Sequence, residues 1–264
     1  MIFTKEQIRF FETFGFIVLR GLMKPDEMDL MTKESEDIMR ELRGDKDFDG
    51  KTRQAVQPFF ERRPFLHSLL GDDRINDIGE ELCGPDFVLD VTEGNLHVGD
   101  TQWHGPFGAW EPLRWIKIGF YTESLRRDTG CLRFVPGSHV IGDPDYYSIL
   151  RDNPEDPETF RPFGVKASEV PCYPVECEPG DVIVFVETLL HASFGGRAGR
   201  HQHAINFFEK PKTEEQIQSV KKQYAKSTFM LRPPISNVES SDPRIRRMVA
   251  GLLELGFDTM DIQV

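Results

Sequence analysis

Two histidines stand at the ends of strand-like runs, where imidazole side chains could bind a metal. The first, His104, lies in the stretch TQWHGPFGAW, and the second, His191, lies in ETLLHASFGG. Small residues flank both, so an ion would have room beside each ring. Imidazole binds zinc, copper, iron and nickel alike, so the pair alone does not select the metal. We expect surface or structural roles for the other histidines, which are His67, His97, His139, His201 and His203.

An arginine follows the second histidine across a glycine-rich turn. The stretch HASFGGRAGRHQHAINF would reverse direction at its glycines and bring Arg200 onto a strand beside the one that carries His191. A guanidinium in that position can bind a carboxylate through two parallel hydrogen bonds. The alternative is a surface arginine next to Arg197. The first interpretation predicts a metal with a carboxylate-bearing ligand beside it.

The elements that must position these residues are mainly strands. From Phe87 onward the runs FVLDVTEGNLHVGD, LRWIKIGFYTES, CLRFVPGSH and GDVIVFVETLLHASFGG are separated by Gly, Pro and Asp. Such spacing predicts a barrel or a sandwich rather than βαβ units. Helical periodicity is found toward the two ends of the chain, and TKEQIRFFETFG opens on a capping-box pattern. We therefore expect a mainly β chain with flanking helices.

The length of the chain predicts a single domain over residues 1–264. Helices and a strand in residues 1–86 should frame a β core in 87–210, and further helices should follow in 211–264. An acidic, proline-bearing insertion at 143–170 interrupts the core. It is a candidate lid over the site or a solvated surface loop.

The charge balance bears on the class of partner. The formal net charge is −12, from 32 Lys and Arg against 44 Asp and Glu. Nucleic acids and anionic membranes attract clustered Lys and Arg, so we expect neither as a partner. No apolar run reaches the roughly 18 residues of a membrane span, and the first residues lack the pattern of a signal peptide. These features predict a cytoplasmic protein that acts on a small molecule, and they leave its oligomeric state open.

The order of the motifs resembles the phytanoyl-CoA dioxygenase family of Fe(II)- and 2-oxoglutarate-dependent oxygenases. The resemblance rests on DTQWH, DTGCLRFVPGSH and PGDVIVFVETLLHASFGGRAGR, which follow an N-terminal helix and strand, and it extends to about Lys210. It implies a double-stranded β-helix, a jelly-roll or cupin-like barrel, with iron near its open mouth. It also implies 2-oxoglutarate and O2 as cosubstrates.

The resemblance assigns roles to four residues. The family binds iron through an H-x-D/E pair and a distal histidine, a facial triad that leaves positions for 2-oxoglutarate and oxygen. His104 matches the first histidine and His191 matches the distal one. Arg200 matches the arginine that binds the far carboxylate of 2-oxoglutarate. Ser193 occupies the place of a hydroxyl that often supports the same carboxylate.

The chain departs from the family pattern at the acidic ligand. The motif HGP at 104–106 stands where histidine, any residue and an acid would be. One interpretation is a halogenase-like site in which chloride takes the position of the acid. A second is an oxygenase in which water or another carboxylate, from Glu111, Asp100 or Glu93, completes the metal site. A third is a barrel that is non-catalytic, or that holds zinc or nickel as a hydrolase or isomerase.

These observations together favour an oxygenase that hydroxylates or otherwise oxidises an unactivated C–H bond of a small metabolite. Arg200 decides the choice, because a hydrolase would have no use for a dicarboxylate anchor. Lys117, in the strand RWIKIGFY, has no assigned role. Aromatic residues near the metal motif could line a substrate pocket, although core packing is their more common role; these are Trp103, Phe107, Trp110 and Trp115.

Overall fold

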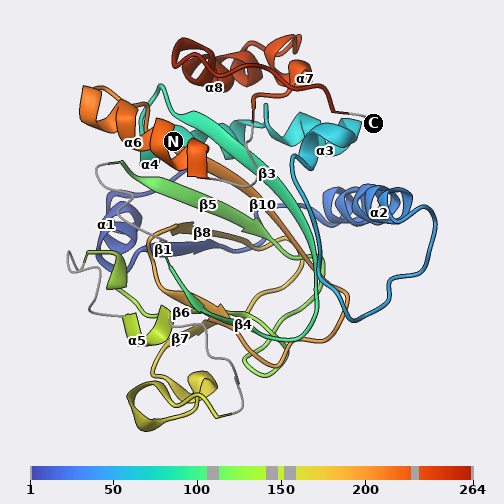
Figure 1. Cartoon of the computed structure of the whole chain (residues 1–264), viewed down its shortest axis with the longest axis vertical. Helices are drawn as coiled ribbons and strands as arrows, with labels where there is room; N and C mark the ends of the chain where they lie inside the picture. The colour runs from blue at the N-terminus through green and yellow to red at the C-terminus, as the bar shows by residue number, and fades with distance from the viewer. Residues whose placement is uncertain (1, 106–112, 141–147, 152–158, 227–231, 263–264) are drawn as a thin grey trace.

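Two facing β-sheets form the centre of the computed structural model, which describes residues 2–105, 113–140, 148–151, 159–226 and 232–262. Their strands are β1 (Phe16–Leu19), β2 (Gln54–Val56), β3 (Val88–His97), β4 (Thr101–His104), β5 (Trp115–Phe120), β6 (Leu132–Phe134), β7 (Tyr173–Val175), β8 (Val182–Val186), β9 (His191–Ser193) and β10 (Arg200–Phe208). Six strands form one sheet in the order β1-β8-β5-β10-β3-β2, and four form the other in the order β4-β9-β6-β7 (Figure 1). The fold is the predicted double-stranded β-helix.

Aromatic side chains hold the two sheets together at one side of the barrel. Phe16 on β1 and Phe185 on β8 both pack against Phe134 of the smaller sheet, with ring centroids 4.9 and 5.0 Å apart. Aromatic pairs at such distances contribute beyond the area that they bury. This aromatic contact closes one side of the barrel. The polar part of the interior is formed by strands farther along the larger sheet.

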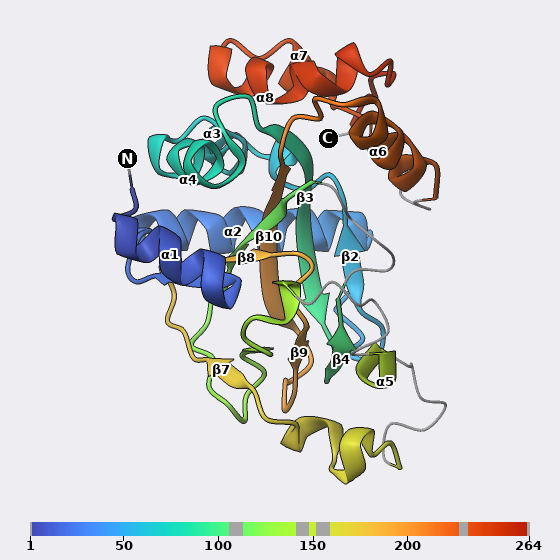
Figure 2. The ribbon, with the colours of Figure 1, turned by 90° about the vertical axis from the view of Figure 1, so that its left-hand side faces the viewer.

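Helices from both ends of the chain cover the outer face of the larger sheet (Figures 1 and 2). Alternate residues of the strands, such as Val184 and Ile118, point outward into this apolar layer, as the two-residue period of a strand requires. No helix within the described residues is both long and apolar enough to cross a bilayer. The α-helices of the whole described chain, including α5 in the insertion, are α1 (Lys5–Phe14), α2 (Pro25–Leu42), α3 (Pro64–Leu69), α4 (Asp73–Cys83), α5 (Ser148–Arg151), α6 (Glu214–Lys226), α7 (Ile235–Val238) and α8 (Pro243–Glu254).

The N-terminal helix begins as its sequence predicts. Thr4 Oγ1 accepts a hydrogen bond from the Gln7 backbone N–H at 3.2 Å, and Gln7 Oε1 accepts one from the Thr4 N–H at 2.8 Å. This reciprocal pair is a capping box. The helix ends at Gly15, whose φ of 81° is the left-handed conformation that glycine adopts without strain.

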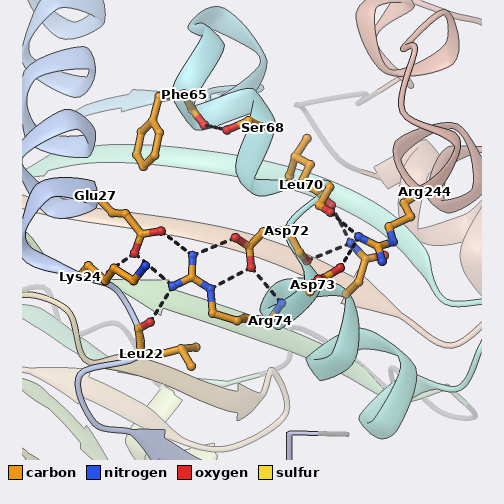
Figure 3. Close-up of polar contacts among 12 residues, drawn as sticks. Leu22, Lys24, Glu27, Phe65, Ser68, Leu70, Asp72, Asp73, Arg74 and Arg244 are labelled. Atoms are coloured by element: carbon orange, nitrogen blue, oxygen red, sulfur yellow. Dashed lines mark hydrogen bonds and ion pairs between the residues drawn. The ribbon is translucent and has the colours of Figure 1, made fainter.

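Arg74 ties the helical layer together behind the sheet (Figure 3). Its guanidinium donates to Glu27 Oε1 of α2 at 2.6 Å, to Asp72 Oδ2 at 2.8 Å and to the Leu22 carbonyl at 2.8 Å. Asp72 also caps α4 by accepting from the Arg74 backbone N–H at 2.8 Å. Hydrogen bonds to Asp72 and Glu27 raise the pKa of Arg74. Charge-assisted bonds of this kind fix α2 against α4.

The insertion packs on the outer face of the smaller sheet where it is described. Leu150 and Val170 belong to an apolar cluster with Trp103. Trp103 Nε1 donates to the Ala167 carbonyl at 2.8 Å, so this tryptophan is a core residue. Trp115 likewise stacks on a phenylalanine, Phe208, with ring centroids 4.2 Å apart. Phe107 and Trp110 lie outside the described residues.

The inner face of the larger sheet is polar along three neighbouring strands. Arg200 on β10 pairs in register with His97 on β3, and Asn206 near the other end of β10 pairs with Lys117 on β5. The intervening residues His203 and Ile205 point to the opposite face, because strand residues alternate. Charges inside a barrel require partners, and a bound ligand can supply them. This face is therefore a candidate ligand-binding site. Its polar residues are His97, Asn95, Glu93, Lys117, Arg200, Gln202 and Asn206.

His203 is buried in the outer layer and makes stability depend on pH. Neither ring nitrogen has a hydrogen-bond partner among the described residues, and the ring packs on Phe59 with centroids 5.4 Å apart. Burial lowers the pKa of His203 to about 3, below the value of 6.5 expected for an unperturbed histidine. The unfolded chain therefore binds the extra proton first, and stability falls as the pH falls from about 6.5 toward 3.

We expect the melting temperature to decrease over this acidic range and His203→Phe to weaken the decrease. Phenylalanine keeps an aromatic ring against Phe59 and removes the group that must be deprotonated to fold. Thermal melts followed by circular dichroism at constant ionic strength, from pH 7 to pH 4, measure both slopes. Equal slopes for the two proteins would contradict this role of His203.

Candidate functional site

The two predicted metal ligands lie side by side. His104 ends β4 and His191 begins β9, and the two residues pair directly across these antiparallel strands. Their imidazole rings have centroids 4.0 Å apart. Strand pairing thus brings together two histidines that are far apart in the sequence, close enough for one metal ion to contact both rings.

Each of the two rings is oriented by a backbone carbonyl two residues earlier in the chain. His104 Nδ1 lies 2.8 Å from the Gln102 carbonyl oxygen, and His191 Nδ1 lies 2.7 Å from that of Leu189. A carbonyl oxygen only accepts, so Nδ1 carries the proton in both rings. The lone pair of each neutral ring is therefore on Nε2. A hydrogen bond from the other ring nitrogen to a carbonyl is typical of histidines that bind metals.

Burial keeps both rings neutral. It lowers the pKa of His104, and the positive charge of Lys117 acts in the same direction. The pKa of His191 is lowered well below its ordinary value by burial and by the neighbouring His104. Phe185 and Phe134 contact the His191 ring, with centroids 5.0 and 6.3 Å away. Because a metal binds the neutral imidazole, neither ring would have to lose a proton to act as a ligand.

Arg200 is buried without partners for much of its guanidinium. The residue is 2% exposed, and neither Nε nor Nη1 has a hydrogen-bond partner within the described parts of the chain. A buried donor without an acceptor costs about 1–3 kcal/mol, and more when it is charged. The arrangement is therefore suited to an anionic ligand that supplies the missing acceptors.

Two glycines make room for this guanidinium. A Cβ atom at Gly196 would lie 1.6 Å from Arg200 Nη1, and one at Gly130 would lie 1.8 Å from it. Ser193 is also buried here, and its Oγ donates to the Gly130 carbonyl at 2.8 Å. The predicted cosubstrate residues Arg200 and Ser193 thus meet around Gly130. The unpaired guanidinium donors of Arg200 fit the far carboxylate of 2-oxoglutarate.

A second arginine, Arg53, lies near Arg200 and was not predicted from the sequence. Arg53 precedes the short strand β2, and its Nη2 donates to Asn95 Oδ1 at 2.7 Å. Asn95 Nδ2 in turn donates to Gln202 Oε1 at 2.8 Å. Burial lowers the pKa of Arg53, and the charge of Arg200 lowers it further. The sequence feature that could have indicated a polar partner for Arg53 is the alternation E-x-N-x-H in β3, which is unusual for a strand inside a barrel.

Lys117 forms an ion pair at the other end of the polar face. Its Nζ lies 2.8 Å from Glu93 Oε1, and Asn206 Nδ2 donates to the same oxygen at 2.6 Å. Burial alone would raise the pKa of Glu93, but the charge and hydrogen bond of Lys117 outweigh it and the pKa is lowered. Glu93 is therefore an ionised carboxylate that already has partners.

The position of the missing acidic ligand is not filled by a described residue. Across the described ranges no group of three His, Cys, Asp or Glu side chains is arranged to hold a metal ion. Of the substitutes considered, Glu93 is paired with Lys117, and Asp100 Oδ1 accepts from the Gly195 N–H at 2.6 Å. Pro106 and Glu111 lie outside the described residues. Two histidines are thus the protein ligands that this geometry supplies.

Known proteins match both the sequence and the fold. An ectoine dioxygenase of Bordetella bronchiseptica is 22% identical over 167 residues, which are 57% of this chain and 53% of the relative. The chain therefore spans about half the length of the curated relatives first matched. SnoK, a non-heme alpha ketoglutarate dependent carbocyclase from nogalamycin biosynthesis, shares the fold with a TM-score of 0.61 and 18% identity, over 79% of this chain and 85% of SnoK.

A second solved structure is EctD from S. alaskensis with 2-oxoglutarate and 5-hydroxyectoine. It has a TM-score of 0.60 and 18% identity with this chain, over 79% of this chain and 77% of EctD. At these identities the two structures establish the fold. The family model described as phytanoyl-CoA dioxygenase (PhyH) matches residues 11–204, which is well over half of the chain. The chain therefore belongs to the PhyH family.

Proposed function

We propose that the chain is an Fe(II)- and 2-oxoglutarate-dependent oxygenase that oxidises a C–H bond of a small molecule. The observation that carries the proposal is the buried guanidinium of Arg200, which lacks acceptors for Nε and Nη1 among the described residues. It lies on the inner face of the same barrel that pairs His104 with His191. Membership of the PhyH family supports the same function.

Each residue has a definite task in this proposal. His104 and His191 would hold Fe(II) through Nε2, and Arg200 with Ser193 would bind the far carboxylate of 2-oxoglutarate. When bound with O2, the iron and 2-oxoglutarate supply an oxidant for an unactivated C–H bond, and 2-oxoglutarate becomes succinate and CO2. The protein orients the cosubstrate, and Phe185 beside His191 excludes water from that side.

Chlorination of a C–H bond is a second candidate outcome. It is favoured by the motif HGP at 104–106, which leaves no acid at the expected position, and by the two-histidine group that the described residues supply. Chloride would take the coordination position that the acid leaves, whereas in the oxygenase water would take it. A zinc or nickel hydrolase is disfavoured, because it would leave the buried Arg200 without a ligand.

An anaerobic titration tests the function and separates the two outcomes. We expect Fe(II) and 2-oxoglutarate together to give the visible charge-transfer band of a chelated complex, at a ratio of one iron per chain. Sodium chloride should be compared with sodium sulfate at equal ionic strength. A shift specific to chloride would favour chlorination, and a band that ignores chloride would favour the oxygenase. Failure of the band to form would overturn the proposed function.

A further inference from the structure

Charges on the inner face of the barrel are separated toward two ends. Arg200 stands at the start of β10, and Lys117 pairs with Asn206 six positions along, or about 20 Å at the rise of a strand. Lys117 interacts electrostatically with Glu93, Glu187 and Asp90, although it is a single ammonium. We call these four side chains, with Asn206, the carboxyl-rich end. Cations gather at one end of the face and carboxyls at the other.

The carboxyls at this end outnumber the cations that neutralise them. Glu93 is paired with Lys117, and Asp90 Oδ1 accepts from the Tyr224 hydroxyl at 2.7 Å. Glu187 lies directly after β8 and its backbone N–H donates to the Trp115 carbonyl at 2.9 Å, but its side chain has no hydrogen bond or ion pair with any other described residue. Burial raises the pKa of Glu187 to about 8 and that of Asp90 to about 6. Desolvation is the largest cause of both shifts, and the charges of neighbouring carboxylates act in the same direction.

Asn206 adds an independent sign of a ligand. The residue is 1% exposed, and its Nδ2 donates to Glu93 while its Oδ1 receives no hydrogen bond from the described chain. The amide orientation is set by Glu93, an acceptor that requires the NH2 group on its side. A buried acceptor without a donor is costly. The atoms without partners at this end are thus acceptors, which call for a donor with positive charge.

We propose that the carboxyl-rich end binds a protonated amine of the substrate. This inference rests on the proposed function, because it names the class of molecule that the oxygenase would oxidise. A primary ammonium offers three donors, enough for Glu187, the Asn206 oxygen and one further acceptor. Lys117 pairs in register with Phe185, whose ring lies 5.0 Å from that of His191, so this end adjoins the metal ligands. An amine held there would place the neighbouring carbons toward the histidines.

The same charges keep the cosubstrate and the substrate apart. A dicarboxylate is attracted to Arg200 and repelled by the carboxylate of Asp90, whereas an amine has the opposite preference. The carboxyls and the amide oxygen that favour a cation come from β3, from β10 and from Glu187 directly after β8.

Calorimetric titration with n-butylamine at pH 7.5 tests this inference, with n-butanol and butyrate as neutral and anionic probes of similar shape. We expect the amine to bind the protein, and butanol and butyrate to bind at least about tenfold more weakly. Glu187→Gln keeps the shape and removes a carboxyl that can ionise against a bound ammonium, and it should weaken amine binding by at least about tenfold. The matched control is Glu215→Gln on the exposed surface of α6, which should bind as the parent does.

These titrations need neither iron nor 2-oxoglutarate, so their failure is separable from failure of the proposed function. Glu187→Gln should fold, since the side chain has no bond to lose within the described chain, and should keep the charge-transfer band. Equal binding of amine and butanol, or unchanged amine binding in Glu187→Gln, would overturn the inference while a retained band would leave the oxygenase standing. Amine binding without any band would overturn the oxygenase and keep the amine site.

Discussion

Alanine at His191 is expected to abolish retention of Fe(II) and the turnover of 2-oxoglutarate, and alanine at His104 should have the same effect. The described residues offer two protein ligands, so either substitution removes half of the protein's hold on the metal. In sites with a full set of ligands, loss of an outer partner alone costs about 10- to 100-fold in affinity or activity. Loss of a ligand from this smaller set should exceed that range.

Two measurements follow the effect without a known substrate. Iron content after dialysis reports binding, and succinate formed from 2-oxoglutarate in the presence of O2 reports turnover uncoupled from substrate. His67→Ala is the matched control, because His67 lies on α3 in the helical layer and bonds Asn237 through Nε2. Its iron content should equal that of the parent. Full iron content in His104→Ala or His191→Ala would refute the assignment of that histidine.

The sequence was sufficient to place these two histidines because their surroundings are local. Each lies in a short strand next to small residues, and each Nδ1 donates to the carbonyl of the residue two positions earlier in the chain. Such contacts depend on neighbours in the chain. The capping box of α1 was readable for the same reason, since Thr4 and Gln7 are three residues apart.

The carboxyl-rich end could not be predicted, because it depends on strand register. Lys117 and Asn206 face each other across β5 and β10, and Glu93 reaches them from β3. The β3 and β10 ladder also shifts register between Asn206 and Phe207, where β3 has an additional residue at Asp90. A bulge of this kind changes which face a side chain points to, and no turn motif signals it in advance.

The net charge of the chain likewise conceals the charges of its interior. A value of −12 indicates an acidic surface and says nothing of Arg200, which is 2% exposed. The insertion shows a similar limit, because its acidic sequence suggested a lid or a solvated loop. Its described part contributes Leu150, Ala167 and Val170 to an apolar cluster on the smaller sheet. Three apolar residues spread over the 143–170 insertion do not form the regular spacing that would indicate a helix or a strand in the sequence.

Arg200→Ala is expected to weaken 2-oxoglutarate binding by more than about 100-fold, the equivalent of two charge-assisted hydrogen bonds. Arg200→Lys keeps the charge but loses the paired donors, so its affinity should lie between those of the parent and the alanine variant. Equilibrium titration of the anaerobic charge-transfer band measures all three. Arg197→Ala is the control, because Arg197 is exposed and pairs with Glu123 at 3.0 Å.

Gly196→Ala tests the same site without substituting the arginine. The new Cβ would fall 1.6 Å from Arg200 Nη1 and force the guanidinium out of its place, so 2-oxoglutarate affinity should drop by about tenfold or more.

The melting temperature of the ligand-free protein tests whether Arg200 has a structural role. If Arg200 only stabilised the fold, its removal would lower the melting temperature. Arg200→Met should instead keep or raise the melting temperature of the ligand-free protein, because a buried guanidinium with unpaired nitrogens destabilises the fold that contains it. Lost stability combined with unchanged 2-oxoglutarate affinity would make Arg200 a structural residue and remove the main support for the proposed oxygenase.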